Sequence, residues 1–396
     1  MKIIINTANY IDNSFMPNLT QGIVGQGVKC VVLKPNSLNE KKIERIGEIK
    51  IINYRYFIKK YENFYKFGIR ESISNSKFNY LKLFLLMVSQ FYNLMKICIY
   101  EKPDFIYAHW LVPQGIISYL VGKILKIKVV FTSHGSDVLV FKKFGKIGKL
   151  ISKKIILSFH RTSVNSQLTL NQITEMFNEN ELITKTTTII PMPIEEIFFS
   201  DKFQKKYEKN FSEGINFLYI GRLVEEKGIK ILLDSFLKLY SKNINVNLQI
   251  AGEGPLRDYI LNFIKINNIA NVVNLIGYVE QNNKLNTIKD SDIVVIPSMT
   301  FSNHIEGGPL TLIEAMASSR IALVSDSIGF VDYCTDMKNC FLFKSNSSED
   351  LFRKMLNILN LNLNEANKIS ENAKKMAESF SIEKISKQIV QHLFTN

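Results

Sequence analysis

Residues 306–315 read EGGPLTLIEA, and they follow an apolar segment, DIVVIPS, at residues 292–298. The apolar segment predicts a buried strand, and the later residues predict a helix whose first position suits Pro309. Two glycines let a ligand approach the backbone closely, and the free N–H groups of the first helical turn form an anion site. Glu306 precedes this helix, and Glu314 lies about 7–8 Å along its axis. The order predicts a phosphate site with a carboxylate on each side, which suits a phosphorylated sugar.

A second segment supplies cations. Residues 215–220 read as a buried strand, and GRLVEEKG follows at residues 221–228 before another helix. Arg222 stands at the end of the strand, and Lys227 just before the helix. Ligands of an open α/β sheet bind outside the carboxyl ends of the strands, where an arginine fork and a lysine point charge would meet a diphosphate. The alternative is that both cations are solvated loop charges beside two neighbouring glutamates.

Strand and helix patterns alternate along the chain, which predicts parallel sheets with helices on both faces. A Pro-Met-Pro sequence and a Lys-rich stretch at residues 191–214 read as a linker between two halves. Strands are expected near residues 2–6, 29–33, 49–54, 104–108, 128–132 and 160–165 in the first half, and near 215–220, 246–251, 272–276, 291–296 and 320–325 in the second.

Four motifs follow one another in the second half: GRLxxxKG from Gly221, IAGEGP from Ile250, PS from Pro297 and Glu-x7-Glu from Glu306. In this order and spacing they resemble the retaining GT-B glycosyltransferases of the large family 4, also called glycosyl transferases group 1. The match covers residues 215–330 and extends more loosely over the whole chain. The resemblance implies an α/β fold, GT-B, with two Rossmann-like domains facing each other across a cleft.

The same resemblance implies a division of labour between the two domains. Residues 1–193 would form an N-terminal Rossmann-like domain that binds the acceptor, and residues 194–380 a C-terminal Rossmann-like domain that binds the nucleotide sugar. The C-terminal helix, residues 381–396, would cross back onto the first domain. By this resemblance the chain is a retaining, metal-independent hexosyltransferase. It would move a sugar from a nucleotide diphosphate sugar, with UDP as the expected carrier, to a lipid-linked or growing saccharide in surface polysaccharide synthesis.

Residue roles follow from the matched motifs. Arg222 and Lys227 would neutralise the leaving diphosphate as its charge grows, and Glu314 would hold the ribose hydroxyls. Glu306 would fix the hydroxyls of the donor sugar. No Asp-x-Asp stands beside these motifs, so neither a catalytic metal nor a cofactor is expected. The expected catalytic residues are His134, Glu306, Arg222 and Lys227, and the expected donor-binding residues are Gly221, Arg222, Lys227, Leu310, Thr311 and Glu314.

Histidines follow two strands of the first half. The segment VVFTS at residues 129–133 ends in His134 and a glycine, so this imidazole can point into the crevice. Similar enzymes place such a histidine near the primary hydroxyl of the donor sugar; the alternative is a histidine bonded to loop backbone. His109 and Trp110 follow another strand in the same way. The tryptophan suits stacking on a sugar or packing in the core.

Charge is unevenly distributed along the chain. The whole sequence carries a formal net charge of +14, and residues 1–193 hold 27 basic and 12 acidic residues against 23 and 24 in the remainder. The basic excess of the first half points to a polyanionic or membrane-surface partner. Nucleic acid is not expected, because the sequence shows neither zinc spacing nor an RNA-recognition signature.

Residues 141–157 predict a basic amphipathic helix. They contain six lysines and no acid, with Lys142, Lys146, Lys149 and Lys153 on one stripe and Phe144, Ile147, Ile151 and Ile155 on another. Such a helix, with the mixed aromatic and basic residues 54–70, is typical of segments that lie on anionic lipid. The alternative is a helix whose apolar stripe packs on its own core. No stretch reaches about 18 uninterrupted apolar residues, so the expected location is cytoplasmic, peripheral on the inner face of the cell membrane.

Two other functions stay open at this point. One is a GT-B-fold epimerase that acts on a UDP-linked amino sugar without an acceptor, and the other is a non-catalytic membrane-associated scaffold. The paired glutamates and the basic N-terminal half speak against the epimerase, and the intact set of cations and glutamates speaks against the scaffold. The acceptor side also departs from the family pattern, because residues 9–18 lack the paired glycines that many relatives carry after the first strand.

Overall fold

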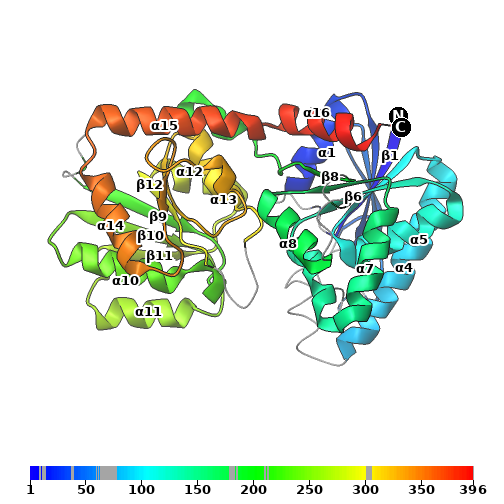
Figure 1. The fold of residues 1–396 in the computed structure, drawn as a ribbon, viewed down its shortest axis with the longest axis horizontal. Coiled ribbons are helices and arrows are strands. Elements are labelled where there is room, and N and C mark those ends of the chain that lie inside the picture. The colour runs from blue at the N-terminus through cyan, green and yellow to red at the C-terminus, as the bar shows by residue number, and fades with distance from the viewer. Residues whose placement is uncertain are drawn as a thin grey trace. The chain divides into compact units, whose positions relative to one another are not determined.

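The protein is described by a computed structural model. It describes residues 1–8, 10, 15–36, 40–58, 60, 62, 78–177, 183, 186–208, 211, 214–299 and 306–395. The chain forms two compact units: Met1–Pro193 together with Ile382–Asn396, and Ile194–Ser381. Figure 1 shows a sheet flanked by helices in each unit. The first unit is called the N-terminal unit below, and the second the C-terminal unit.

The N-terminal unit is built on an eight-stranded sheet in the order β3-β4-β2-β1-β5-β6-β7-β8. All neighbouring strands are parallel except β3 and β4, which are antiparallel. The strands are β1 Lys2–Asn6, β2 Lys29–Pro35, β3 Ile43–Ile46, β4 Ile49–Tyr54, β5 Phe105–His109, β6 Lys128–Ser133, β7 Arg161–Val164 and β8 Thr187–Ile189.

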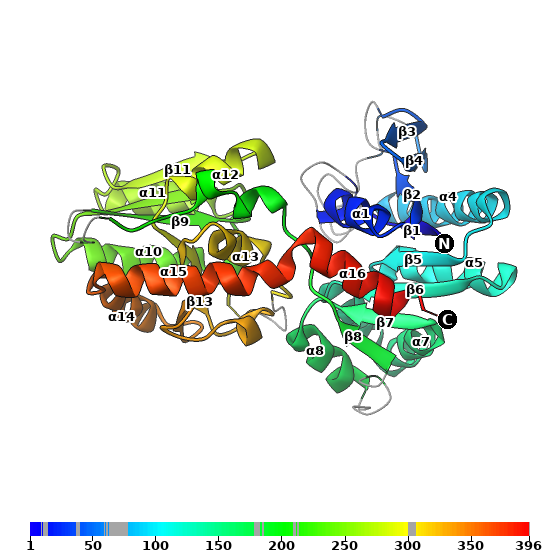
Figure 2. The ribbon, with the colours of Figure 1, turned by 90° about the horizontal axis from the view of Figure 1, so that it is seen from above.

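Helices cover both faces of this sheet, as Figure 2 shows from above. On one face lie α1 (Phe15–Gly25) and the C-terminal helix α16 (Ile382–Leu393), which pack with Ile3 and Ile5 of β1. On the other face lie α4 Phe78–Glu101, α5 Ile116–Leu125, α7 Gly145–Ser158 and α8 Gln167–Phe177. Their buried side chains pack with Ile4, the residue of β1 that points the opposite way.

The C-terminal unit has a six-stranded sheet in the order β11-β10-β9-β12-β13-β14, with every pairing parallel. The strands are β9 Ile215–Ile220, β10 Val246–Ala251, β11 Val273–Gly277, β12 Ile293–Ile296, β13 Ile321–Ser325 and β14 Phe341–Phe343. One face is covered by α10 Ile229–Tyr240, α11 Arg257–Ile266 and α14 Ser348–Leu359, and the other by α12 Gln281–Lys289, α13 Leu310–Ala317 and α15 Leu363–Ala377.

The strands expected from sequence all occur within two residues of their expected ends. Three further strands, β3, β8 and β14, were not predicted. β3 is an edge strand whose side chains are mostly exposed, so it lacks the apolar alternation that marks a strand. The other two span only three residues each, too short to show a period.

The basic segment at residues 141–157 differs from the predicted single helix. A 3-10 helix at Val140–Phe144 precedes α7, and the break falls at Gly145, whose φ of 59° lies in the left-handed region. Among the four apolar residues of the predicted stripe, Ile155 is buried, whereas Phe144, Ile147 and Ile151 are exposed. The stripe therefore does not pack on the protein's own core as the alternative interpretation required.

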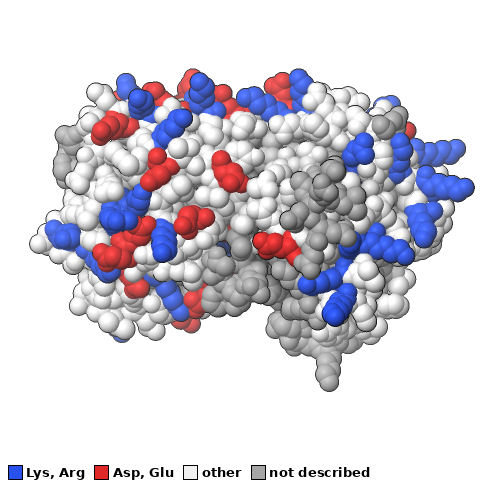
Figure 3. Space-filling view, viewed as in Figure 1, with Lys and Arg blue, Asp and Glu red and all other residues white. Residues whose placement is uncertain are grey.

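Charged side chains differ between the units. On the face shown in Figure 3, lysine and arginine dominate over the N-terminal unit, while both signs mix over the C-terminal unit. This agrees with the sequence counts of 27 basic and 12 acidic residues in the first 193 positions.

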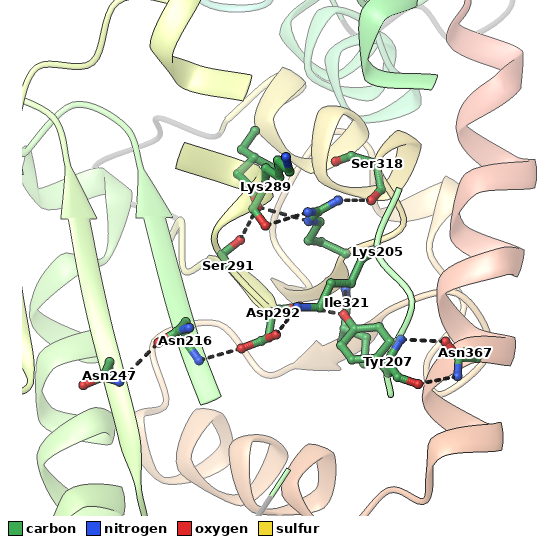
Figure 4. Close-up of polar contacts among 12 residues, drawn as sticks. Lys205, Tyr207, Asn216, Asn247, Lys289, Ser291, Asp292, Ser318, Ile321 and Asn367 are labelled. Carbon is green, nitrogen blue, oxygen red and sulfur yellow. Dashed lines mark hydrogen bonds and ion pairs between the residues drawn. The ribbon is translucent and has the colours of Figure 1, made fainter. Parts of the chain in front are cut away.

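A polar network closes the amino ends of the C-terminal sheet (Figure 4). The carboxylate of Asp292 accepts a hydrogen bond from the backbone N–H of Asn216 at 2.9 Å and pairs with Lys205 at 2.6 Å. The hydroxyl of Tyr207 donates to the carbonyl of Asp292 at 2.7 Å and accepts from the N–H of Ile321 at 3.0 Å. These bonds hold the start of the unit against β9, β12 and β13 at the amino ends of the strands.

Candidate functional site

Three side chains meet beyond the carboxyl ends of β9 and β12. The ammonium of Lys227, at the end of a short 3-10 helix after β9, forms an ion pair with Oε1 of Glu306. Ser298, two residues after β12, donates its hydroxyl to Oε2 of Glu306 at 2.6 Å. The backbone of Glu306 is fixed as well, because its carbonyl accepts the N–H of Gly329 at 2.7 Å.

The surroundings keep Glu306 ionised. Burial alone would raise the pKa of this carboxyl, but the charge and hydrogen bond of Lys227, the hydroxyl of Ser298 and the charge of Arg222 hold its pKa below the usual range. A negatively charged Glu306 can accept hydrogen bonds from sugar hydroxyls but cannot donate a proton near neutral pH.

Arg222 lies close to this pair without touching it. Its Nη2 is 3.6 Å from Oε1 of Glu226, and 56% of its side chain is exposed. Its backbone carbonyl accepts the hydroxyl of Tyr219 at 2.8 Å, which fixes the start of the loop. The guanidinium stands on a fixed loop, and a phosphate would be a better partner for it than the carboxylate of Glu226 at 3.6 Å.

The loops after β9 and β10 pack backbone against backbone. The N–H of Gly221 donates to the carbonyl of Ala251 at 3.0 Å. Gly252 has a φ of 148°, and a Cβ there would stand 1.9 Å from the carbonyl oxygen of Gly221. Only glycine fits such a contact, so the IAGEGP motif supports the loop that carries Arg222.

Glu314 lies on α13 as predicted, and it has a cationic partner that the sequence did not reveal. Its side chain on α13 is only 4% exposed, and its Oε2 lies 2.5 Å from the ammonium of Lys284 on α12. Apart from this ion pair, Oε2 accepts no hydrogen bond from the described residues. Sequence reasoning missed Lys284. The signal was its position four residues before the buried Ile288, which places both on one face of α12.

The start of α13 is shifted by one residue. Pro309 is extended, with φ −74° and ψ 108°, and precedes the helix rather than opening it. The first turn is therefore Leu310, Thr311 and Leu312, as the prediction for backbone N–H donors at Leu310 and Thr311 requires. Gly308 lies under the ring of Phe330, where a Cβ would stand 2.5 Å from Cζ, so this loop has no room for a side chain.

The histidines of the N-terminal unit form an aromatic cluster. Nδ1 of His109 is 3.1 Å from Nε2 of His134, and the ring of Trp110 lies 4.6 Å from that of His134. Asp137 fixes the loop, because its carboxylate accepts the hydroxyl of Ser133 at 2.8 Å and the N–H of His134 at 3.1 Å. The imidazole of His134 is thus bonded to another imidazole rather than to loop backbone.

Both imidazoles are neutral at physiological pH. Burial lowers the pKa of His134 to about 3. Burial lowers the pKa of His109 well below its ordinary value. The positive charge that His134 carries when it is protonated lowers it further. Burial raises the pKa of Asp137 despite the hydrogen bonds that it accepts. A neutral His134 can donate or accept one hydrogen bond to a sugar hydroxyl without adding charge.

The predicted residues fall into three groups. Lys227 and Glu306 are in contact, with Arg222 near them; Glu314 pairs with Lys284; and His134 belongs to the other unit. Among the described residues no three His, Cys, Asp or Glu side chains gather as a metal site would require. In the mixed aromatic and basic segment 54–70, residues 59, 61 and 63–70 lie outside the described residues, as does His304.

Comparison with known families identifies the two units. Residues 200–376 match the model for glycosyl transferases group 1, and residues 9–165 match the model for glycosyl transferase 4-like proteins. The fold has the GT-B architecture of solved glycosyltransferases, which confirms the predicted pair of Rossmann-like α/β domains. The chain belongs to the glycosyltransferases.

Three similar proteins illustrate the relationship. An uncharacterized glycosyltransferase of Methanocaldococcus jannaschii is 27% identical over 72% of this chain and 73% of its own length. The putative teichuronic acid biosynthesis glycosyltransferase of Bacillus subtilis is 26% identical over 63% of this chain and 59% of its own. Anabaena HepE, solved in complex with UDP, superposes with a TM-score of 0.70 and 14% identity, covering 99% of each chain.

Proposed function

We propose that this protein is a retaining hexosyltransferase that takes its sugar from a UDP-linked donor and passes it to a lipid-linked or growing saccharide of a surface polysaccharide. The observation that carries the proposal is the convergence of Lys227, Glu306 and Ser298 beyond the carboxyl ends of β9 and β12. The relative in teichuronic acid biosynthesis and the UDP complex of HepE support the choice of pathway and carrier.

The donor diphosphate would form ion pairs with the two cations of the site, Lys227 and Arg222. Lys227 holds Glu306 in the free protein, and a diphosphate would offer this ammonium a second anionic partner. Arg222, which is largely exposed, would supply a two-pronged contact to the same group. Both charges act most strongly when the bond to the leaving oxygen breaks and negative charge develops on it. No metal is required for this neutralisation.

The sugar and the nucleoside of the donor would be bound on either side of the diphosphate. Glu306, kept ionised by its neighbours, would accept hydrogen bonds from the sugar hydroxyls, and His134 would contact the primary hydroxyl as a neutral imidazole. Glu314 would bind the ribose only after its ion pair with Lys284 opened. The N–H groups of Leu310 and Thr311 would face the phosphates at the start of α13.

The acceptor side would work at a membrane. Lysines of residues 141–157 would draw the N-terminal unit to anionic lipid on the inner face of the cell membrane, where a lipid-linked acceptor is presented. Exposure of Phe144, Ile147 and Ile151 supports this role.

A donor assay tests the proposal. The purified protein is incubated with a panel of nucleotide sugars, with and without membrane extract, and release of the nucleotide and fate of the sugar are followed. Transfer to a component of the extract supports the proposal. An epimerised nucleotide sugar in both arms would identify an epimerase, and unchanged nucleotide sugars in both arms would identify a scaffold.

A further inference from the structure

Helix α4 is apolar on its outer face as well as its inner face. Inside, Leu86, Leu94 and Ile97 are buried against the sheet. On the outside, apolar and aromatic side chains recur every four residues. Their exposed fractions are 61% for Tyr80, 61% for Phe84, 50% for Val88 and 64% for Tyr92. A helix that is apolar all round is normally buried, yet only 28% of the most apolar window of α4 is buried. Its outer face therefore exposes a surface that water solvates poorly.

The neighbouring helices continue this surface. α4 contacts α5, and α5 contacts α7, along one face of the sheet (Figures 1 and 2). On α5, Ile124 is exposed by 57%, and on α7, Ile147 and Leu150 are exposed by 72% and 69%. Exposed apolar groups on three adjacent helices form a patch larger than isolated surface residues make, and such patches mark interaction sites.

Charge on these helices has one sign. Among residues 78–101, 116–125 and 145–158 the only acid is Glu101, at the end of α4. Its carboxylate is bound by Lys2 at 3.1 Å and by Lys50 at 2.7 Å, so it adds no free negative charge to the surface. Exposed lysines stand among the apolar groups: Lys96, Lys123, Lys146 and Lys154.

We propose that the outer faces of α4, α5 and α7 form one docking surface for an anionic lipid bilayer, with α4 lying in the plane of the interface. This deepens the membrane role in the proposed function, which rests on the lysines of residues 141–157. Phe84, Val88 and Tyr92 enter the boundary between headgroups and acyl chains, about 5–10 Å deep, and the lysines meet the phosphates.

Helix α4 meets the length and composition of a membrane span, but its packing assigns it to the surface instead. Asn79–Glu101 is long and apolar enough to cross a bilayer. To cross, it would have to withdraw Leu86, Leu94 and Ile97 from the core that they share with Ile4 of β1. Burying only the outer face leaves that core intact and covers the exposed side chains.

Charge favours lipid over a second copy of the chain as the occupant. Two such faces placed against each other would bring lysines near lysines with no acid between them, and like charges at an interface oppose association. An anionic bilayer offers phosphates to the lysines and an apolar layer to the side chains between them. Exposed tyrosines near the two ends of α4, Tyr80 and Tyr100, match the aromatic residues that favour membrane interfaces.

The dependence of vesicle binding on salt distinguishes apolar insertion of this docking surface from electrostatic attraction by lysines alone. Charge attraction fades at about 1 M salt, where the screening length is about 3 Å, whereas apolar insertion persists. The test is sedimentation with vesicles of phosphatidylglycerol and phosphatidylcholine across a salt series, with no sugar donor present. The variant carries Phe84→Ser, Val88→Ser and Tyr92→Ser. The matched control carries Ile266→Ser, Tyr278→Ser and Met337→Ser, which are exposed by 77%, 64% and 58% on the C-terminal unit.

Wild type and control are expected to stay bound at high salt, and the α4 variant to lose about a hundredfold in partition there. Equal partition of variant and control at high salt would overturn the proposal. So would a wild-type dimer in lipid-free solution that the α4 variant converts to a monomer. A second variant, Phe84→Trp, keeps the surface apolar and so does not depend on a polar substitution; its added fluorescence must be quenched by brominated lipid. Nucleotide-sugar turnover on a soluble acceptor is measured separately, so loss of the donor reaction and loss of docking are distinguishable.

Discussion

Lys227 and Glu306 are 79 residues apart in the chain, and their side chains form an ion pair beyond the carboxyl ends of β9 and β12. Ser298 binds the other carboxylate oxygen, so both oxygens of Glu306 are engaged before any ligand arrives. Positioning of this kind lets a site meet developing charge without reorganising. The lysine is placed by the loop after one strand and the glutamate by the loop after the neighbouring strand.

Removing a donor-site cation should slow the reaction more than it weakens binding. Arg222→Ala and Lys227→Ala should each reduce turnover by about a hundredfold, because about 3 kcal/mol of transition-state stabilisation is lost. Steady-state kcat and the Kd of the nucleotide sugar are the measurements. Lys238→Ala, which removes an exposed lysine paired with Glu349, is the control. Near-normal turnover in both site variants would show that Arg222 and Lys227 do not neutralise the leaving diphosphate.

The pair of Lys284 and Glu314 should matter for folding. Lys284→Met leaves the buried Glu314 carboxylate without its cation and should lower the free energy of unfolding by about 3 kcal/mol. Adding Glu314→Gln should restore most of that loss, since no buried charge then stays unpaired. Urea denaturation of both variants and wild type gives the values. If the single and double variants are equally destabilised, Lys284 and Glu314 do not stabilise the fold as a buried ion pair.

Lysines of the basic segment 141–157 should provide the salt-sensitive part of membrane binding. Replacing Lys142, Lys146, Lys149 and Lys153 by Gln should release the protein from anionic vesicles at low salt, since each lysine near the surface contributes about 1 kcal/mol. Activity on a short soluble acceptor should survive, and activity on a lipid-linked acceptor should fall. Vesicle sedimentation over a salt series is the measurement. Identical curves for the variant and the wild type would show that these lysines are only solvated.

Stability should fall on acidification through the imidazole pair. The pKa of His134 is about 3 in the folded chain against an ordinary 6.5, and that of His109 is also lowered. Between pH 6.5 and pH 3 the unfolded chain binds protons that the folded chain does not. The contribution of the neutral imidazoles to the free energy of unfolding is therefore fully present above about pH 6.5 and is lost progressively as the pH falls toward 3. The raised pKa of Asp137 acts in the opposite direction. His134→Gln should therefore flatten the dependence of Tm on pH. An unchanged slope in that variant would contradict the assigned pKa.

Much of the fold was predictable because buried parallel strands are short apolar runs. β9 and β10 occur with the predicted ends, Ile215–Ile220 and Val246–Ala251. β3 was not predictable, since an exposed edge strand shows no such run. The division of residues 141–157 at Gly145 also escaped prediction, because a glycine inside a helical pattern is often tolerated.

At the site, sequence predicted residue types better than contacts. Arg222 was placed at a strand end, and Lys227 and Glu306 were each placed just before a helix; the structure brings the last two together. It could not predict that Glu314 would be buried against Lys284, because that contact depends on how α12 and α13 pack. The bond between His109 and His134 has the same origin: β5 and β6 are neighbours, and His109 pairs with Thr132, two residues before His134.

The anomeric configuration of the product tests the central claim most directly. The purified protein is given a UDP-α-linked hexose and a saccharide acceptor in the presence of a metal chelator, and the new linkage is read by proton NMR. The account predicts an α-linked product, formed at a rate that the chelator does not change and that Lys227→Ala lowers about a hundredfold. A β-linked product, or a sugar that leaves the site epimerised and still attached to UDP, would contradict it.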